Sequence, residues 1–251
     1  MFKQLFGGKK QSGEGSLSVL KTDLHSHLIP GIDDGSPDLE TSLEMIRGLM
    51  ELGYRKFITT PHIMSDAYPN TPEIIRAGLD KLREAVAEAG LDVKLEAAAE
   101  YYLDEIFIAN LDKVELLTFG GERKFLLFET SYISRPMSLG DTIFRLQSLG
   151  YSPVMAHPER YQFFWRESGV DEIRGLRNRG LKMQVNLASF TGRQGRRAAI
   201  IAREMAKEGM IDFLGSDLHR PSQVATVGKA PAASKELRQL LQNATLLNQE
   251  L

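Results

Sequence analysis

The chain has 251 residues, of which 42% are hydrophobic and 25% are charged, which is typical of an average soluble globular protein. The absence of cysteine excludes disulfides, thiolate metal sites and cysteine nucleophiles. A formal net charge of −2 gives no overall attraction to nucleic acid or to an acidic membrane. Because we find neither an apolar run of about 20 residues nor a signal-peptide pattern, we expect a cytoplasmic protein.

Residues 1–16 combine glycine, serine and charge without hydrophobic periodicity, which predicts a flexible N-terminal leader. From residue 17 to residue 251 we expect one domain, because this length lies near the upper limit of a single hydrophobic core. Residues 222–251 predict a terminal helix that packs on the outside of this domain.

Amphipathic helices have clear start and stop signals. Ser36-Pro37-Asp38 and Thr71-Pro72-Glu73 each offer an N-cap, a proline at the first helical position and an acid in the first turn. Glycine is expected to end the helices at Gly53, Gly90, Gly150, Gly180 and Gly209.

A short apolar run follows each of these glycines, and two further runs bring the number of predicted strands to seven. These are residues 17–24, 57–59, 93–95, 125–128, 153–155, 183–185 and 211–214. Alternating strands and helices predict an α/β fold with parallel strands. Seven such units in a row favour a closed or nearly closed barrel that resembles a TIM barrel, and a doubly wound open sheet is the alternative.

Every histidine of the sequence falls at or just beyond the carboxyl end of a predicted strand. These residues are His25, His27, His62, His157 and His219. Because the carboxyl ends of parallel strands meet at one face, we expect all five to lie close together. His25 and His27 are two residues apart on an extended segment, so their side chains are expected to point to the same side.

Four carboxylates follow the same pattern, and each also has an ordinary structural interpretation. Asp34 lies in a turn after the first two histidines, and Asp217 lies two residues before His219. Glu100 and Glu129 end apolar runs, where a carboxylate is costly unless a cation meets it. For any single residue the alternative is a salt bridge to arginine, a helix cap or a buried hydrogen bond. To replace the metal-site interpretation, a separate alternative of this kind would have to be true for every one of these residues.

Imidazoles with carboxylates suit zinc, manganese or iron. The candidate ligands are His25, His27, Asp34, His62, Glu100, Glu129, His157, Asp217 and His219. They are too many for one ion, so we expect two or three divalent ions. The charge of three such ions would exceed that of the four carboxylates, and this surplus favours a phosphate dianion as the substrate group.

The ordered motifs D-x-H-S-H, P-G-x-D-D-G, T-P-H, A-E-Y, F-E, A-H-P-E-R-Y and S-D-x-H resemble the PHP (polymerase and histidinol phosphatase) superfamily. They are most similar to its capsule-associated branch, the CpsB/YwqE-type tyrosine-protein phosphatases. The match spans residues 17–221. The resemblance implies a distorted (β/α)7 barrel with a trinuclear centre, and it favours manganese over iron or zinc.

The resemblance also implies a role for each site residue. One ion would be held by His25, His27, Glu100 and Asp217, a second by Glu100, Glu129 and His157, and a third by Asp34, His62 and His219. The arginines that orient the phosphate in the family fall on Arg160 and Arg220. Arg220 follows His219 immediately, whereas relatives often place this arginine several residues later, so a solvent-exposed loop arginine is the alternative.

These observations predict a metal-dependent phosphomonoester hydrolase in which hydroxide formed from a bound water attacks the phosphate directly. By resemblance, the substrate would be a phosphotyrosine protein, such as the tail of a bacterial tyrosine autokinase in capsule or exopolysaccharide synthesis. The alternatives are a histidinol-phosphatase-like hydrolase, a nuclease, which the near-neutral charge disfavours, and a non-catalytic scaffold held together by metal. We expect no nucleic-acid partner, and the sequence leaves open whether the protein forms a homo-oligomer.

Two further clusters have alternative interpretations. A basic run could attract an acidic partner or form a solvated helix face: Arg193, Arg196, Arg197 and Arg203. Aromatic residues after predicted strand ends could line a pocket for an aromatic ring or belong to the core: Tyr101, Tyr102, Tyr132, Tyr161, Phe163, Phe164 and Trp165.

Overall fold

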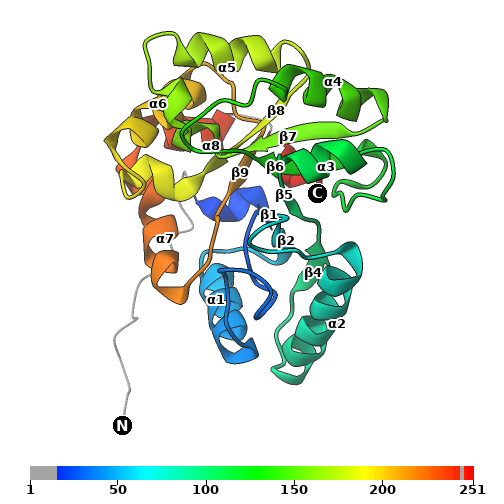
Figure 1. Ribbon diagram of the computed structural model, residues 1–251. Helices are drawn as coiled ribbons and strands as arrows, with labels where there is room; N and C mark the ends of the chain where they lie inside the picture. Colours follow the sequence, from blue (N-terminus) through cyan, green and yellow to red (C-terminus); the bar gives the residue numbers. More distant parts are fainter. Residues whose placement is uncertain (1–15, 244–245) are drawn as a thin grey trace.

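The computed structural model of the chain describes residues 16–243 and 246–251 (Figure 1). Nine strands in these residues pair in parallel into two sheets, with the orders β1-β2-β4 and β3-β5-β6-β7-β8-β9. They are β1 (Thr22–Leu24), β2 (Lys56–Thr59), β3 (His62–Ile63), β4 (Lys94–Ala97), β5 (Glu100–Tyr102), β6 (Phe125–Glu129), β7 (Ser152–Ala156), β8 (Lys182–Asn186) and β9 (Phe213–Gly215). The predicted α/β fold with parallel strands is confirmed, while the predicted leader lies outside the described residues except for Ser16.

Two short strands that the sequence did not predict, β3 and β5, follow the predicted strands at 57–59 and 93–95, which accounts for nine strands in place of seven. β2 ends at Thr59 and β3 begins at His62. Pro61, between them, has no N–H with which to continue a ladder. Backbone hydrogen bonds from Ala98 N to Thr59 O (2.9 Å) and from Glu100 N to Pro61 O (3.0 Å) lead from the first sheet into the second.

The predicted closed barrel is not confirmed, because no ladder joins β9 to β1 in the described part of the chain. The segments of the two strands form backbone hydrogen bonds with each other only beyond their carboxyl ends, where His27 N donates to Leu218 O (2.9 Å) and Asp217 N donates to His25 O (2.7 Å). Further down, the Asn248 side-chain amide donates to a carbonyl oxygen of β1 (3.2 Å) and to one of β9 (2.8 Å). A side chain near the C-terminus therefore stands where a ladder would close the sheet.

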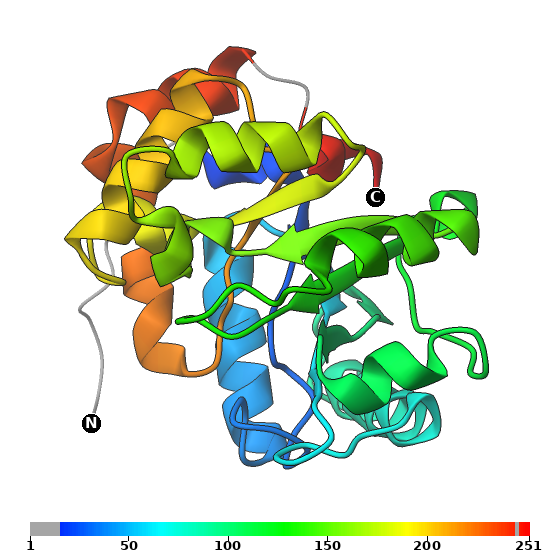
Figure 2. The same ribbon diagram turned by 45° about the horizontal axis from the view of Figure 1, so that its top comes forward.

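The helices lie around the outside of the strands (Figures 1 and 2). They are α1 (Leu39–Glu51), α2 (Pro72–Glu88), α3 (Glu105–Asn110), α4 (Leu139–Ser148), α5 (Gly169–Arg177), α6 (Arg196–Lys207), α7 (Val224–Ala233) and α8 (Lys235–Asn243). Short 3-10 helices are η1 (Leu17–Leu20), η2 (Gly121–Arg123), η3 (Pro158–Arg160), η4 (Gln162–Phe164), η5 (Leu187–Thr191), η6 (Pro221–Gln223) and η7 (Leu247–Glu250). None of the helices in the described residues has the length and apolar character needed to cross a bilayer.

Of the two predicted N-caps, the structure confirms the one at α2 and contradicts the one at α1. α2 begins as predicted, with Pro72 as its first residue and the Thr71 hydroxyl accepting from Ile74 N at 3.3 Å. The N-cap of α1 is Asp38, whose carboxylate accepts from Thr41 N at 2.8 Å. The prediction of Ser36 as this cap is wrong, because its buried hydroxyl instead donates to the Asp38 carbonyl oxygen.

The predicted helix ends are confirmed. All five predicted glycines have positive φ angles, between 63° and 103°. The predicted terminal helix over residues 222–251 is instead broken into separate segments. α7 ends at Ala233, and Ser234 is extended, with φ −137° and ψ 125°. The Ser234 hydroxyl accepts from Leu237 N at 3.2 Å, which starts α8 as a new helix.

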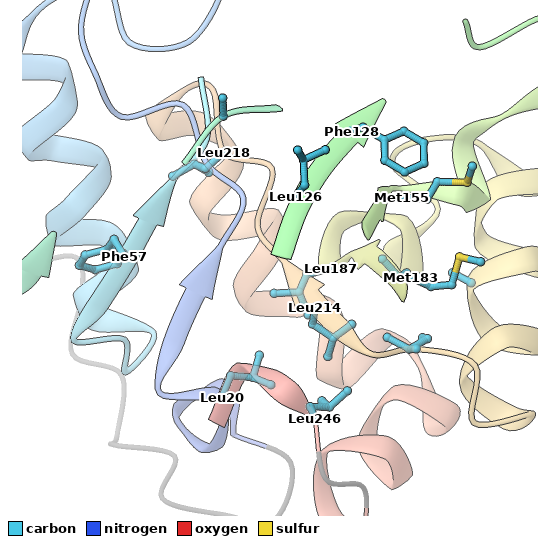
Figure 3. Packing of buried hydrophobic residues seen from close by; sticks show 14 of the residues in the cluster. Leu20, Phe57, Leu126, Phe128, Met155, Met183, Leu187, Leu214, Leu218 and Leu246 are labelled. Carbon is cyan, nitrogen blue, oxygen red and sulfur yellow. The ribbon is translucent and has the colours of Figure 1, made fainter. Parts of the chain in front are cut away.

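Alternation along the strands separates two apolar clusters. Leu126 and Met155 belong to the larger cluster, which packs against the helices and part of which is shown in Figure 3. Their neighbours Leu127 and Val154 belong to a smaller cluster between the strands. Two residues beyond Leu127, at the end of β6, Glu129 shares its face of the strand. The inner cluster therefore leads directly to the polar ends of the strands.

Candidate metal centre

All nine side chains that the sequence predicts as metal ligands come together in the structure. Most of them end or follow a strand, whereas His62 and Glu100 begin the short strands β3 and β5. They form four overlapping groups in which the ligand atoms lie within 4.8 Å of one another. The groups are His27, Asp34, His62 and His219; His25, His27 and Glu100; His25, His157 and Asp217; and His62, Glu100 and Glu129. Except for Asp34 and His219, these residues are buried, so the centre is continuous with the interior of the fold.

Glu100, the first residue of β5, lies at the middle of this centre. Its carboxylate oxygens lie 3.1 Å from His25 Nε2, 3.5 Å from His27 Nε2, 3.3 Å from His62 Nδ1 and 3.0 Å from His157 Nε2. One buried carboxylate therefore faces four imidazoles. This arrangement suits a carboxylate that is shared between cations.

A second carboxylate, that of Asp34, also faces two histidines and lies nearer the surface. Asp34 Oδ1 is 3.5 Å from both His62 Nε2 and His219 Nε2, and the Asp34 side chain is 49% exposed. The His27 and His219 rings stack at 3.9 Å between their centroids. His27 therefore lies between the buried part of the centre and its exposed part.

Three residues of the centre have a left-handed backbone, with φ values of 78° at His25, 33° at His157 and 50° at Asp217. This conformation is unfavourable for residues other than glycine and persists only where the surroundings enforce it. The sequence predicted an extended segment through His25 and His27, but β1 ends at Leu24. The two rings nevertheless lie close together in one group with Glu100, although the backbone between them is not the predicted extended segment, and their sharing of one ion stays a prediction.

The carboxylates control the protonation of three histidines. Burial alone would lower the pKa of His25, but Glu100 and Asp217 outweigh it and raise this pKa to about 9. For His62, Glu100 and Asp34 likewise overcome burial and raise the pKa to about 12. For His219, hydrogen bonding to Asp34 and the charge of Asp217 raise the pKa to about 9. Without metal, these three rings are therefore protonated at neutral pH.

His27 differs from its neighbours. Burial and the positive charge of His219 lower the pKa of His27 to about 4, so its ring is neutral at pH 7. Its Nδ1 lies 2.7 Å from Asp33 Oδ2. Its Nε2 is buried and has no hydrogen-bond partner in the described residues, and neither has His62 Nδ1. Buried polar atoms without partners are rare, and here both face the Glu100 carboxylate, so this donor set fits a divalent cation.

We expect metal uptake by this centre to release protons and to strengthen with pH. A ring nitrogen must lose its proton before it can bind a cation. The pKa values of His25 and His219, raised to about 9, place part of that competition below pH 9, and the still higher pKa of His62 extends it to more alkaline pH. Apparent affinity should therefore rise between pH 6 and pH 9. Calorimetry of Mn²⁺ binding in buffers of different ionisation enthalpy measures both effects. An affinity that stays constant over this range, with no net proton release, would contradict the prediction.

Sequence reasoning missed three residues that hold the ligands in place. Asp33 binds the His27 ring, Gln184 Oε1 lies 2.7 Å from His25 Nδ1, and Asn186 Nδ2 donates to Asp217 Oδ2 at 2.6 Å. A signal was present, because the amides Gln184 and Asn186 alternate with the apolar residues Met183 and Val185 along a predicted strand. Buried strands carry such polar pairs only where partners meet them.

The two predicted arginines have different positions. Arg160 lies at the edge of the centre, where its Nη1 donates to Asp217 Oδ2 at 3.0 Å. Its guanidinium carbon is 4.7 Å from the centroid of the Tyr132 ring, and its side chain keeps 29% exposure. Arg220 is exposed and forms no ion pair within the described residues. Its contact with phosphate therefore stays a prediction.

Some of the aromatic residues after the strand ends belong to the core, as one of the two interpretations expected, and Tyr132 does not share their complete burial. Tyr101, Tyr161 and Phe164 are buried and belong to the core. Tyr132 is partly exposed and stacks on His157, with 5.6 Å between ring centroids. Of these four, Tyr132 is therefore the one that is partly exposed at the edge of the centre, where it also contacts Arg160.

Residues 21–239 match the family model described as "Capsular polysaccharide synthesis, CpsB/CapC". The chain is 28% identical over 197 residues to the tyrosine-protein phosphatase YwqE of Bacillus subtilis, covering 78% of this chain and 76% of the relative. It is 25% identical over 232 residues to a Staphylococcus aureus protein named CapC, covering 90% of each. A solved structure from work on YwqE of Bacillus subtilis and CpsB of Streptococcus pneumoniae, described as metal-dependent tyrosine phosphatases, superimposes with a TM-score of 0.74 at 25% identity, covering 90% of this chain and 96% of the other. With a family model matched over most of its length, this chain belongs to the CpsB/CapC family of capsular polysaccharide synthesis proteins.

Proposed function

We propose that this chain is a metal-dependent tyrosine-protein phosphatase. The observation that carries the proposal is the set of four histidines around the Glu100 carboxylate in a chain whose relatives are named as such phosphatases. The substrate would be phosphotyrosine in a protein. A tyrosinate leaving group, with a pKa of about 10, departs more easily than a serine alkoxide and needs less help from a general acid.

The proposed centre holds two or three divalent ions, with manganese favoured over iron or zinc. One ion would be bound by His25, His27, Glu100 and Asp217, a second by Glu100, Glu129 and His157, and a third by Asp34, His62 and His219. Support for the first and third sets comes from the short distances within them, and the second is supported by the 3.0 Å separation of His157 Nε2 and Glu100 Oε1. When bound, such ions supply Lewis acidity toward the phosphoryl oxygens and the attacking water.

Arg160 is proposed to bind and orient the phosphate. Its guanidinium has five N–H donors, of which one binds Asp217, so others remain for two phosphate oxygens. The Tyr132 ring lies under the guanidinium and restricts its position by a cation–π contact. A bidentate contact of this kind stabilises the charge of the transferred phosphoryl group.

We further propose that the physiological substrate is a phosphoprotein of capsule or exopolysaccharide synthesis, such as the tail of a tyrosine autokinase. Charge at the surface supports an acidic partner. Arg193 and Lys229, both exposed, line a hollow of about 430 Å³ together with Thr191, Gly192 and Thr226. Neither cation forms an ion pair within the described part of the chain, so both remain available for acidic side chains of a bound protein.

A substrate panel with a chelation arm tests the proposed function. Purified protein loaded with Mn²⁺ is given a phosphotyrosine peptide, a phosphoserine peptide, histidinol phosphate and single-stranded DNA. We expect hydrolysis of the phosphotyrosine peptide alone, its loss on treatment with EDTA without unfolding by circular dichroism, and its recovery when Mn²⁺ is returned. Cleavage of only one of the other compounds would refute the substrate, and unfolding by EDTA in a protein that hydrolyses none of them would favour a metal-held scaffold.

A further inference from the structure

Two buried side-chain amides on β8 form a hydrogen-bonded link between two of the proposed ligands, His25 and Asp217. Gln184 and Asn186 are both fully buried and, being two residues apart, point to the same face of the strand. Gln184 Oε1 lies 2.7 Å from His25 Nδ1, Gln184 Nε2 donates to Asn186 Oδ1 at 3.0 Å, and Asn186 Nδ2 donates to Asp217 Oδ2 at 2.6 Å. A continuous chain of hydrogen bonds therefore runs from an imidazole to a carboxylate.

The orientation of both amides is determined from each end of this chain. The backbone N–H of His157 also donates to the Gln184 atom that faces His25, at 3.3 Å, so that atom must be the amide oxygen. At the other end, the Asp217 carboxylate can only accept, so the Asn186 atom that faces it must be the amide nitrogen. The two assignments agree, because they leave Gln184 Nε2 to donate to Asn186 Oδ1.

We propose that Gln184 and Asn186 are positioning residues that fix the tautomer of His25 and the rotation of Asp217 for cation binding. The inference rests on the metal centre of the proposed function. Since Gln184 presents an acceptor, His25 must carry a proton on Nδ1, and its Nε2 is left to face Glu100 at 3.1 Å. Outer hydrogen bonds of this kind hold histidine ligands in other metal sites.

The same chain of bonds determines which oxygen of Asp217 is free. Oδ2 accepts from Asn186 and from Arg160. Oδ1 is left facing the histidines, at 3.5 Å from His25 Nε2, 3.7 Å from His27 Nε2 and 3.4 Å from His219 Nδ1. The amide pair thus directs one lone pair of an imidazole and one carboxylate oxygen toward the same point.

The test measures metal affinity and the tautomer of His25, neither of which depends on hydrolysis. Zn²⁺ serves as a diamagnetic probe, with affinity measured by chelator competition and the ring protons located by long-range ¹H–¹⁵N correlation spectra of the histidines. In the zinc-loaded wild type we expect the His25 proton on Nδ1. Gln184→Leu should weaken zinc binding by about 10- to 100-fold and remove the Nδ1–H signal. Asn186→Leu should weaken binding but leave that signal in place.

Two further variants keep the result interpretable. Gln184→Glu retains the acceptor for His25, so the Nδ1–H signal should survive even if Gln184→Leu fails to fold. Gln147→Leu, at an exposed amide that donates to the Arg179 carbonyl oxygen on the surface, should leave both readouts at wild-type values. A His25 proton on Nε2 in the zinc-loaded wild type or in Gln184→Glu would overturn the proposal, as would wild-type zinc affinity in Gln184→Leu. A protein that shows the expected tautomer and affinities but hydrolyses no phosphotyrosine would refute the proposed function and leave this inference standing.

Discussion

Replacing Glu100 by glutamine is expected to lower hydrolysis of a phosphotyrosine peptide by about 10³-fold. The carboxylate faces four imidazoles at 3.0 to 3.5 Å, and a neutral amide there can neither balance two cations nor accept from every side. Loss of a bound cation removes several kcal/mol of transition-state stabilisation, and each 1.36 kcal/mol corresponds to about a factor of ten in rate. Steady-state kinetics and elemental analysis of the same preparation measure the loss of activity and the loss of metal together.

Glu96→Gln is the matched control for this substitution. Glu96 lies on β4, four residues before Glu100, and its carboxylate pairs with Lys56 (2.9 Å) and Lys94 (2.7 Å) at the surface. Surface pairs of this kind contribute little, so activity and metal content should match those of the wild type. Full metal content together with wild-type turnover in Glu100→Gln would show that the centre does not depend on this carboxylate.

Gly215→Ala is expected to destabilise the fold and disable the centre at once. A Cβ at this position would lie 2.4 Å from the Leu24 carbonyl oxygen, 2.6 Å from Gln184 Nε2 and 2.9 Å from the His25 Cβ. The backbone oxygen cannot move aside alone, so either β9 or β1 must shift. We expect a loss of about 3 kcal/mol, at the upper end of the usual cost of overpacking, and a fall in Tm of about 6 °C or more for a chain of this length. Thermal unfolding of the metal-free protein isolates the packing effect from metal binding.

Gly175→Ala is the matched control, because the same substitution is expected to maintain or raise the stability at this position. Gly175 lies inside α5, and a Cβ there would meet nothing within 4 Å. Alanine in a helix interior is favoured over glycine by about 0.5–1 kcal/mol, so this variant should unfold at the wild-type temperature or above it. If Gly215→Ala were as stable and active as Gly175→Ala, this result would contradict the close packing of β9 against β1 and Gln184.

The sequence predicts best those features that depend on short segments. The cap at Thr71 and the glycines after the helices follow from local backbone preferences, and the structure agrees with them. Ser36 shows the limit of such reasoning. Its residue type fits a cap, but its hydroxyl is buried and bonded elsewhere. Burial of that hydroxyl depends on the packed fold, which a local pattern does not contain.

The sequence predicted the gathering of the candidate ligands more accurately than it predicted the closure of the sheet around them. Histidines and carboxylates at strand ends are predicted to meet wherever parallel strands lie side by side, and this holds whether or not the sheet closes. Closure depends instead on the pairing of β1 with β9, where Asn248 intervenes from far along the chain. The hydrogen bond between Gln184 and His25 was missed for a related reason, since the two residues are 159 positions apart in sequence.

Side-chain contacts between the first strand and the segment that follows the last strand have a consequence for biosynthesis. Asp23 and Ser216, whose side chains are hydrogen-bonded at 2.9 Å, are separated by 193 positions. A polypeptide leaving the ribosome has His25 and His27 from the beginning, but it lacks Asp217 and His219 until most of its length has been translated. Contacts between such distant segments form slowly, because a large loop must be ordered before they are made. On the proposed metal centre, we therefore expect the complete set of ligands to capture cations late in maturation, on the finished chain rather than on the nascent one.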